Sequence, residues 1–210
     1  MKPPTEAQLV TAVRRGDHAA LGRLLELHQH RLYNVCLRMV GHRDDAAELT
    51  QDAMLKIIEH IGDFKGHSAL GTWMIRIAMN LSLSHLRKRK LRRTTSLDAD
   101  NGRYVPAGDG GTQAAPLRDR LAGSREPDPS QHVQQREMVA RLHQALGRLD
   151  DDFRAVLVLR DIDQMDYRQI AEVLGVAVGT VKSRLFRARL ALRQQMNELE
   201  GTHEPGPSPA

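Results

Sequence analysis

The sequence predicts an all-α protein of two small helical domains joined by a flexible linker. Three observations support this fold class. Apolar residues recur at spacings of three and four along most of the chain. The interval 94–130 lacks that period and is rich in Gly and Pro. A pattern of two short helices joined by a tight turn runs from Asp166 to Leu192. We therefore expect domains over residues 5–93 and 131–196, a linker over 94–130 and a disordered tail over 197–210.

Composition limits the classes of partner and site. The 210 residues carry a net charge of +5, which fits an anionic partner. Cys36 is the only cysteine, so an intramolecular disulfide and a multi-cysteine metal site are excluded. No apolar run approaches the length of a membrane span, and the N-terminus lacks the apolar core of a signal peptide. We expect a soluble, cytoplasmic protein with no membrane insertion.

Four helices are expected in the first domain, over residues 6–15, 19–40, 43–62 and 72–93. Asp17 is the expected N-cap of the second helix and Gly41 its end, and Asp44 is the expected cap of the third. A loop over 63–71 separates the last two helices. In the second domain, helices are expected over 131–149 and 153–162, ahead of the two-helix pattern.

The helix expected from Thr72 combines an apolar surface with one polar stripe. Its first half, TWMIRIAMNL, is apolar nearly all round, so we expect it to be buried between other helices. A polar stripe on a buried helix needs a protein or ligand partner. The helix ends in six cations within the seven residues 87–93. Such a run is often a solvated, frayed tail, but beside a polar stripe we favour phosphate binding. The stripe consists of Arg76, Asn80, Ser84 and Arg87.

The stretch from Asp166 to Leu192 has the features of a helix-turn-helix. Gly175 tolerates the left-handed conformation that ends a first helix, and Thr180 is the expected N-cap of the second. At 100° per residue, one face of the second helix is apolar and the opposite face carries Ser183 and Arg187. Lys182 and Arg184 lie on its flanks. This arrangement suits base edges in the middle and phosphates at the sides. The alternative is an ordinary amphipathic helix with a solvated basic face.

Two parts of the sequence resemble one known family. The segment 149–192, with its string GTVKSRLFRAR, resembles the fourth conserved region of bacterial sigma factors, and most closely the extracytoplasmic-function group. The strings RLYNVCLRMVGHRDDAAELTQDAMLKI and TWMIRIAMN resemble the second conserved region of the same family. The resemblance implies a protein that binds core RNA polymerase and directs it to a subset of promoters. It also implies an anti-sigma factor that holds the protein inactive.

The resemblance assigns expected roles residue by residue. Duplex DNA of the −35 element is expected to meet Thr180, Lys182, Ser183, Arg184 and Arg187. The melted −10 strand is expected to meet the loop and the helix after it, at Phe64, Ser68, Trp73, Arg76, Asn80, Ser84 and Arg87. Core polymerase is expected to bind the third helix at Glu48, Leu49, Gln51 and Asp52.

Some positions depart from the family or stay open. Housekeeping members carry an aromatic cluster that wedges melted DNA, whereas here Trp73 stands alone on its helix and Phe64 alone in the loop. Melting of promoter DNA should therefore depend more on a well-matched promoter sequence than it does in housekeeping members. Trp73 is equally compatible with a core position. Phe186 lies on the expected DNA side and fits either a thymine methyl group or polymerase. Arg184 lies on a flank that suits phosphate, while the family match also allows a base contact.

Two other classes of protein are alternatives. A simple helix-turn-helix repressor or activator would explain the C-terminal domain but leave the first domain without a role. The ability to bind core polymerase distinguishes a sigma factor from such a regulator. An enzyme is disfavoured because the ten histidines are scattered and no phosphate loop or nucleophile motif occurs. His28 and His30, two residues apart on a helix, point away from each other and make a poor metal pair. We expect no catalytic residue, metal, cofactor or small-molecule substrate.

Overall fold

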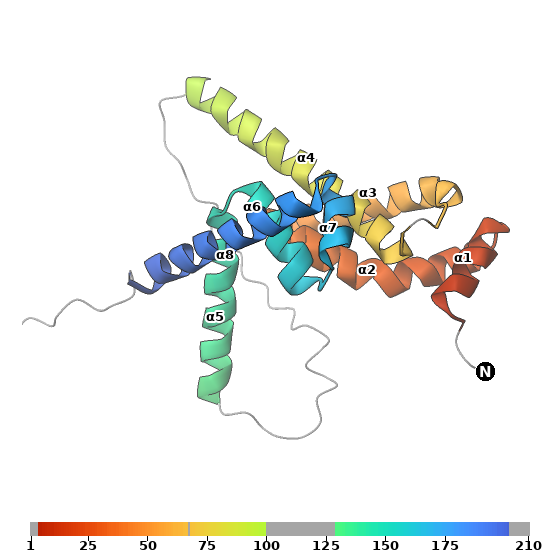
Figure 1. Cartoon of the computed structure of the whole chain (residues 1–210), viewed down its shortest axis with the longest axis horizontal. Coiled ribbons are helices and arrows are strands. Elements are labelled where there is room, and N and C mark those ends of the chain that lie inside the picture. The colour runs from red at the N-terminus through yellow and green to blue at the C-terminus, as the bar shows by residue number, and fades with distance from the viewer. Residues whose placement is uncertain (1–3, 67, 100–128, 202–210) are drawn as a thin grey trace, which may run out of the picture.

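The computed structural model describes residues 4–66, 68–99 and 129–201, and within these ranges every regular element is helical. The helices, shown in Figure 1, are α1 (Glu6–Arg14), α2 (His18–Val40), α3 (Arg43–His60), η1 (Ile61–Asp63), α4 (Leu70–Ala99), α5 (Pro129–Arg148), α6 (Asp151–Leu157), η3 (Val158–Ile162), α7 (Tyr167–Leu174) and α8 (Val178–Gly201). The all-α prediction is confirmed.

In the N-terminal half, α2 lies at the centre and packs against α1, α3 and α4. Leu24, Leu32 and Met39 follow one another along α2, and all three are fully buried. They meet Ile57 of α3 and Met79 of α4 in the same core. The apolar residues that recur at helical spacing in the sequence thus form the buried faces of these helices and pack into one core.

Helix ends follow the local sequence in most places. The Asp17 side chain accepts a hydrogen bond from the Ala20 N–H, and Gly41 ends α2 at a φ of +75°, so both predictions hold. Asp44 is not the cap of α3. The N-cap is His42, two residues earlier, and it makes no side-chain cap bond. Asp44 instead lies in the first turn, where its charge interacts favourably with the helix dipole.

Three helices extend beyond the predicted domain bounds. Helix α5 begins at Pro129, inside the interval predicted as linker. Helix α4 begins at Leu70 rather than Thr72, and it continues to Ala99, into the interval predicted as linker. Helix α8 reaches Gly201, so the first five residues of the predicted tail are helical. The second half of α4 and most of α5 project from the body of the molecule in Figure 1. The rest of the predicted linker up to residue 128, and the tail from residue 202, lie outside the described residues.

In the C-terminal half, the expected helix over 153–162 is divided. Helix α6 passes into a π-helical turn, η3, in which the Asp163 N–H donates to the Val158 carbonyl at 2.9 Å. Helix α7 then starts with a capping box between Asp166 and Gln169, and ends at Gly175 with φ +65° as predicted. Helix α8 starts at Val178. Thr180 is therefore inside its first turn and is not its N-cap, because the Val181 N–H already donates to the Ala177 carbonyl.

The two halves touch each other. Helix α7 packs on α4, and α2 contacts α5, α6 and η3. Arg31 of α2 donates to both carboxylate oxygens of Asp163 at 2.7 and 2.8 Å, and that carboxylate is only 7% exposed. Gln169 of α7 reaches the Thr72 hydroxyl of α4 at 3.5 Å. The predicted helical units are therefore in contact through charged and polar groups as well as apolar ones.

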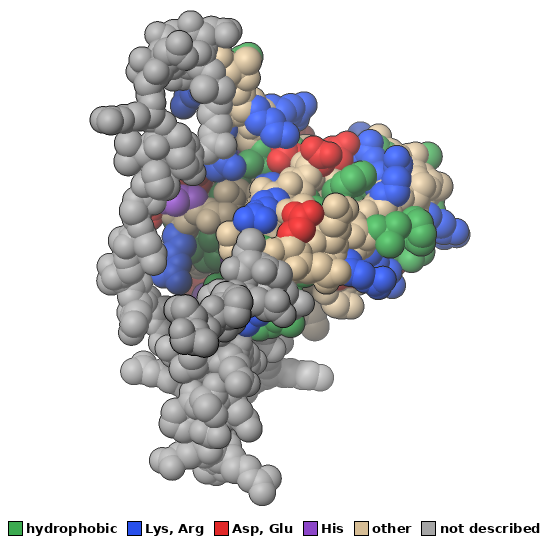
Figure 2. All heavy atoms as spheres, turned by 90° about the vertical axis from the view of Figure 1, so that its left-hand side faces the viewer, with side chains coloured by type: hydrophobic (Ala, Val, Ile, Leu, Met, Phe, Trp, Pro, Cys, Tyr) green, Lys and Arg blue, Asp and Glu red, His purple; other side chains and the backbone are tan. Residues whose placement is uncertain are grey.

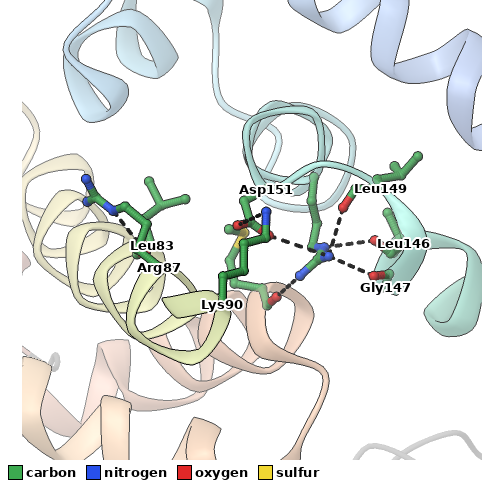
Figure 3. Close-up of polar contacts among 9 residues, drawn as sticks. Leu83, Arg87, Lys90, Leu146, Gly147, Leu149 and Asp151 are labelled. Carbon is green, nitrogen blue, oxygen red and sulfur yellow. Dashed lines mark hydrogen bonds and ion pairs between the residues drawn. The ribbon is translucent and has the colours of Figure 1, made fainter. Parts of the chain in front are cut away.

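One buried arginine joins both halves. Arg154 of α6, with 4% of its surface exposed, donates to the carbonyl oxygens of Leu146, Gly147 and Leu149, and also to that of Met39 in α2. Figure 3 shows the three carbonyls of the C-terminal half converging on the guanidinium, with the Lys90–Asp151 ion pair of 3.0 Å beside it. Burial lowers the pKa of Arg154. The carbonyls replace the lost water, so the charge is held in the interior by hydrogen bonds.

No helix in the described part of the chain is both long enough and apolar enough to cross a membrane.

Candidate nucleic-acid interface

The outward face of α8 lies where the sequence pattern put it. Val181, Leu185 and Ala188 are at most 2% exposed and anchor the helix to the core. Ser183 and Arg187 are exposed on the opposite side. Their groups are held locally, since the Ser183 hydroxyl donates to the Thr180 carbonyl and the Arg187 side chain to the Ser183 carbonyl. The helix therefore presents the Ser183 hydroxyl oxygen, as an acceptor, and guanidinium donors of Arg187 to solvent on a rigid support.

The flanking cations differ in their surroundings. Lys182 is exposed and lies 6.0 Å from the ring centre of Tyr167. Arg184 is half-buried and forms an ion pair with Asp152 at 3.2 Å. Phe186 is 68% exposed, so its ring remains available to a partner. On the part of the surface in Figure 2 that is not drawn in grey, Lys and Arg side chains are interspersed with Asp and Glu side chains. The two flanking cations of α8 are therefore not equivalent donors to an anion, because Arg184 already has a carboxylate partner and Lys182 is exposed.

The polar stripe on α4 faces solvent. Met74, Ile75 and Met79 turn into the core, whereas Arg76 and Asn80 are exposed. The helix is thus not buried all round, which corrects the prediction. Because the stripe is exposed to water, it does not need a protein or ligand partner. Further along the helix, Ser84 is half-buried and Arg87 is exposed. The Arg87 side chain donates to the Leu83 carbonyl one turn earlier, as seen in Figure 3.

The two aromatic residues assigned to the −10 strand pack against each other. The ring centres of Phe64 and Trp73 are 5.5 Å apart, and Phe64 is only 9% exposed. Arg14 of α1 donates to the Phe64 carbonyl and ties this segment to the first helix. Ser68 and Trp73 are half-buried. In this arrangement the Phe64 ring supports Trp73 and is itself covered.

The outer face of α3 contains three of the four residues assigned to core polymerase. Glu48, Gln51 and Asp52 are exposed, but Leu49 is 6% exposed and belongs to the core. Leu55 and Ile58, which the sequence analysis did not assign to this face, are 57% and 43% exposed. At 100° per residue Leu55 falls between Gln51 and Asp52, so the angular analysis used for the second helix of the helix-turn-helix would have found it.

The described residues contain no group of three or more His, Cys, Asp or Glu side chains placed to hold a metal ion. Cys36 is buried, and burial raises the pKa of its thiol, which keeps it protonated.

Comparison with known proteins assigns the two halves to one family. Residues 24–92 match the family model described as sigma-70 region 2, and residues 140–192 match sigma-70, region 4. The RNA polymerase sigma-H factor of Pseudomonas aeruginosa is 32% identical over 195 residues, which cover 92% of this chain and 95% of that protein. The chain belongs to the sigma-70 family. The match over 24–92 gives the first half a role that a simple helix-turn-helix regulator would lack.

Other relatives indicate the group within this family. The ECF sigma factor SigW of Bacillus subtilis is 30% identical, over 90% of this chain and 96% of its own length. The ECF sigma-E factor of Escherichia coli K12 is also 30% identical, over 93% and 96%. This sigma factor is thus of the extracytoplasmic-function group. It binds core RNA polymerase and promoter DNA and directs promoter-specific initiation of transcription.

Solved structures confirm the fold. CnrH in complex with the cytosolic domain of CnrY superposes with a TM-score of 0.60 at 22% identity, covering 90% of this chain and 96% of CnrH. RpoE of Bartonella quintana, in complex with the anti-sigma factor NepR, gives 0.58 at 24%, covering 84% and 96%. The arrangement of helices described above is therefore shared with sigma factors of known structure.

Proposed function

We propose that this sigma factor reads the −35 duplex with α8 and contacts the melted −10 strand with α4 and the segment before it. The observation that carries the −35 assignment is the pairing of two opposite faces on one helix. Val181, Leu185 and Ala188 fix the helix to the core, and Ser183 and Arg187 project outward. A helix held in this way can enter the major groove and present donors to base edges.

The −35 assignment is tested by comparing Arg187→Ala with Lys182→Ala. Arg187 lies in the middle of the outward face, so its loss should remove a base contact, cost about 1–3 kcal/mol on the preferred sequence and flatten preference at one position. Lys182 lies on a flank, so its loss should weaken all sequences alike and reduce the salt slope by about one. The measurement is binding of the reconstituted holoenzyme to a −35 library at several salt concentrations. If Arg187→Ala keeps the wild-type ranking, the assignment is wrong.

For the −10 contact we favour the exposed part of the α4 stripe. Arg76 and Asn80 are accessible on a helix whose other side is firmly packed. An amide and a guanidinium on a rigid helix can hydrogen-bond unstacked bases and backbone. Phe64 would have to leave its contact with Trp73 to take part in base stacking. We therefore assign Phe64 a supporting position under Trp73, and the −10 contact to Trp73, Arg76 and Asn80.

For core polymerase we favour the outer face of α3, with Leu55 as its apolar centre. Glu48, Gln51 and Asp52 surround Leu55 on the helix surface, and Ile58 extends the apolar area by one turn. An apolar centre with a polar rim is the usual arrangement of a protein–protein interface. The acidic rim suits a protein partner better than DNA.

The contact between the halves must open when both promoter elements are bound. In straight duplex, elements centred about 25 base pairs apart are separated by about 85 Å. Because Gln169 touches Thr72, the lengths of α4, α7 and α8 limit the distance between Asn80 and Ser183 to about 50 Å. The closed arrangement therefore cannot reach both elements. We propose that the part of the chain between α4 and α5 acts as the tether that allows the halves to separate.

We further propose that an anti-sigma factor binds this protein and that the sigma factor, itself without catalytic activity, acts in the cytoplasm. The support for the partner and the compartment comes from the two solved structures. RpoE was solved in complex with the anti-sigma factor NepR, and CnrH in complex with the cytosolic domain of CnrY. A partner that stabilises the closed arrangement would block initiation by mass action. A candidate anti-sigma protein should reduce transcription by wild-type protein more than transcription by a variant that favours the open arrangement. Equal inhibition of both would argue against this proposal.

A further inference from the structure

The cations of α8 that the sequence presents as one basic surface have individual partners on neighbouring elements. Arg184 pairs with Asp152 at 3.2 Å, and Arg189 pairs with Asp161 at 2.6 Å. The Arg187 guanidinium lies 5.9 Å from the ring centre of Phe153. Two of these cations are thus paired with surface carboxylates of the protein itself before any DNA arrives.

Asp152 and Phe153 are consecutive residues in the first turn of α6. They hold Arg184 and Arg187, which are three residues apart and therefore neighbours on one side of α8. One short segment of α6 thus supports two arginines of the reading helix. Asp152 is 59% exposed at its side chain and Arg184 is 25% exposed, so the pair lies at the edge of the outward face and not in the core.

A guanidinium has five N–H donors in a planar fork, and the contact with Asp152 leaves several of them unused. A carboxylate on one side of the fork fixes the plane and restricts the rotamers of the arginine. The same carboxylate repels phosphate, since both are anions. An arginine held in this way is withheld from the DNA backbone and prepared for the acceptors of a base edge, of which guanine offers two to an arginine fork.

We propose that Asp152 is a positioning residue that gives α8 part of its sequence discrimination, by directing Arg184 to a base edge instead of a phosphate. The proposal rests on the −35 assignment made above and names a residue outside the set assigned to DNA. It also decides between the two roles that the sequence left open for Arg184.

Asp152→Asn tests this role with little risk to the fold, because the residue is largely exposed and the asparagine has nearly the same shape. In this variant Arg184 loses its carboxylate partner, so its guanidinium should move to the phosphates of the DNA backbone. Binding to all sequences should then become tighter, and the salt slope should steepen by about one. Discrimination at a single −35 position should fall by about fivefold or more, the loss expected for one arginine–base contact.

Two further variants make the test specific. Arg184→Ala should lose discrimination at the same position, and adding Asp152→Asn to it should cause no further loss. Asp161→Asn is the matched control, because it removes the same charge from the other ion pair of α8. It should tighten binding and leave the ranking of −35 sequences unchanged.

The measurement uses full-length protein assembled with core polymerase, a library varied across the −35 element, and several salt concentrations. Thermal unfolding of each variant verifies the fold. An unchanged ranking with Asp152→Asn would overturn the proposal, as would a loss that persists in the Arg184→Ala background. If wild-type holoenzyme itself shows no −35 preference, the −35 assignment fails and this proposal fails with it.

Discussion

The ion pair between Arg31 and Asp163 should control how firmly the two halves are held together. Asp163→Asn removes the charge that accepts two hydrogen bonds from Arg31, at 2.7 and 2.8 Å. Hydrogen bonds to charged groups are worth about 1.5–3 kcal/mol, and the 39% exposure of the arginine reduces this to about 1–2 kcal/mol. The ratio of closed to open molecules should therefore fall by about 5- to 30-fold.

Fluorescence energy transfer between one dye on each half measures this ratio. Exposed Glu59 and Asn197 are suitable labelling positions once replaced by cysteine. The native Cys36 is buried with a raised pKa, so a maleimide should spare it. Asp163→Asn should lower transfer in the free protein. The exchange Arg31→Asp with Asp163→Arg should restore it in part.

The matched control for this experiment is Asp161→Asn, whose ion pair with Arg189 lies within the C-terminal half. It should leave energy transfer unchanged. The reasoning is refuted if Asp163→Asn shows wild-type transfer, or if the control lowers transfer as much as Asp163→Asn does.

Three further predictions concern other parts of the molecule. Gln51→Ala combined with Asp52→Ala should weaken binding to core polymerase with an unchanged circular dichroism spectrum, and unaltered affinity in a titration would remove α3 from the interface. Asn80→Ala should alter which −10 sequences support open complexes while sparing core binding, and identical permanganate footprints and promoter ranking would make the stripe structural. Burial lowers the pKa of His28, so the folded state disfavours its charged form and loses stability as pH falls below about 6.5. His28→Gln should therefore reduce the difference in urea stability between pH 7.5 and pH 5.5, and an unchanged difference would show that this histidine does not contribute.

Local signals in the sequence predicted most of the helices and the outward face of α8. The αL glycines Gly41 and Gly175 and the capping Asp17 act within one turn, so their effect can be read without knowledge of the fold. The buried face of α8 follows from a period of 3.6 residues, which also located Ser183 and Arg187 on the outside.

Features that depend on tertiary contacts were missed or misassigned. Leu49 matched a family position for polymerase binding, but the structure buries it, because family alignment assigns a role to a stretch and not to each side chain within it. Arg31 and Asp163 are 132 residues apart, and no period or motif links them. The four carbonyls around Arg154 likewise come together only through packing of α6 against α2 and the end of α5.

The most direct test of the function is transcription in vitro with core polymerase and a promoter library, in the presence and absence of this protein. We predict transcripts from a defined subset of promoters only when the protein is present. Within that subset, Arg187→Ala should change the accepted −35 sequences, and Asn80→Ala the accepted −10 sequences. Transcription that is unaffected by the protein, or a protein that binds the same DNA but never recruits core polymerase, would contradict the account.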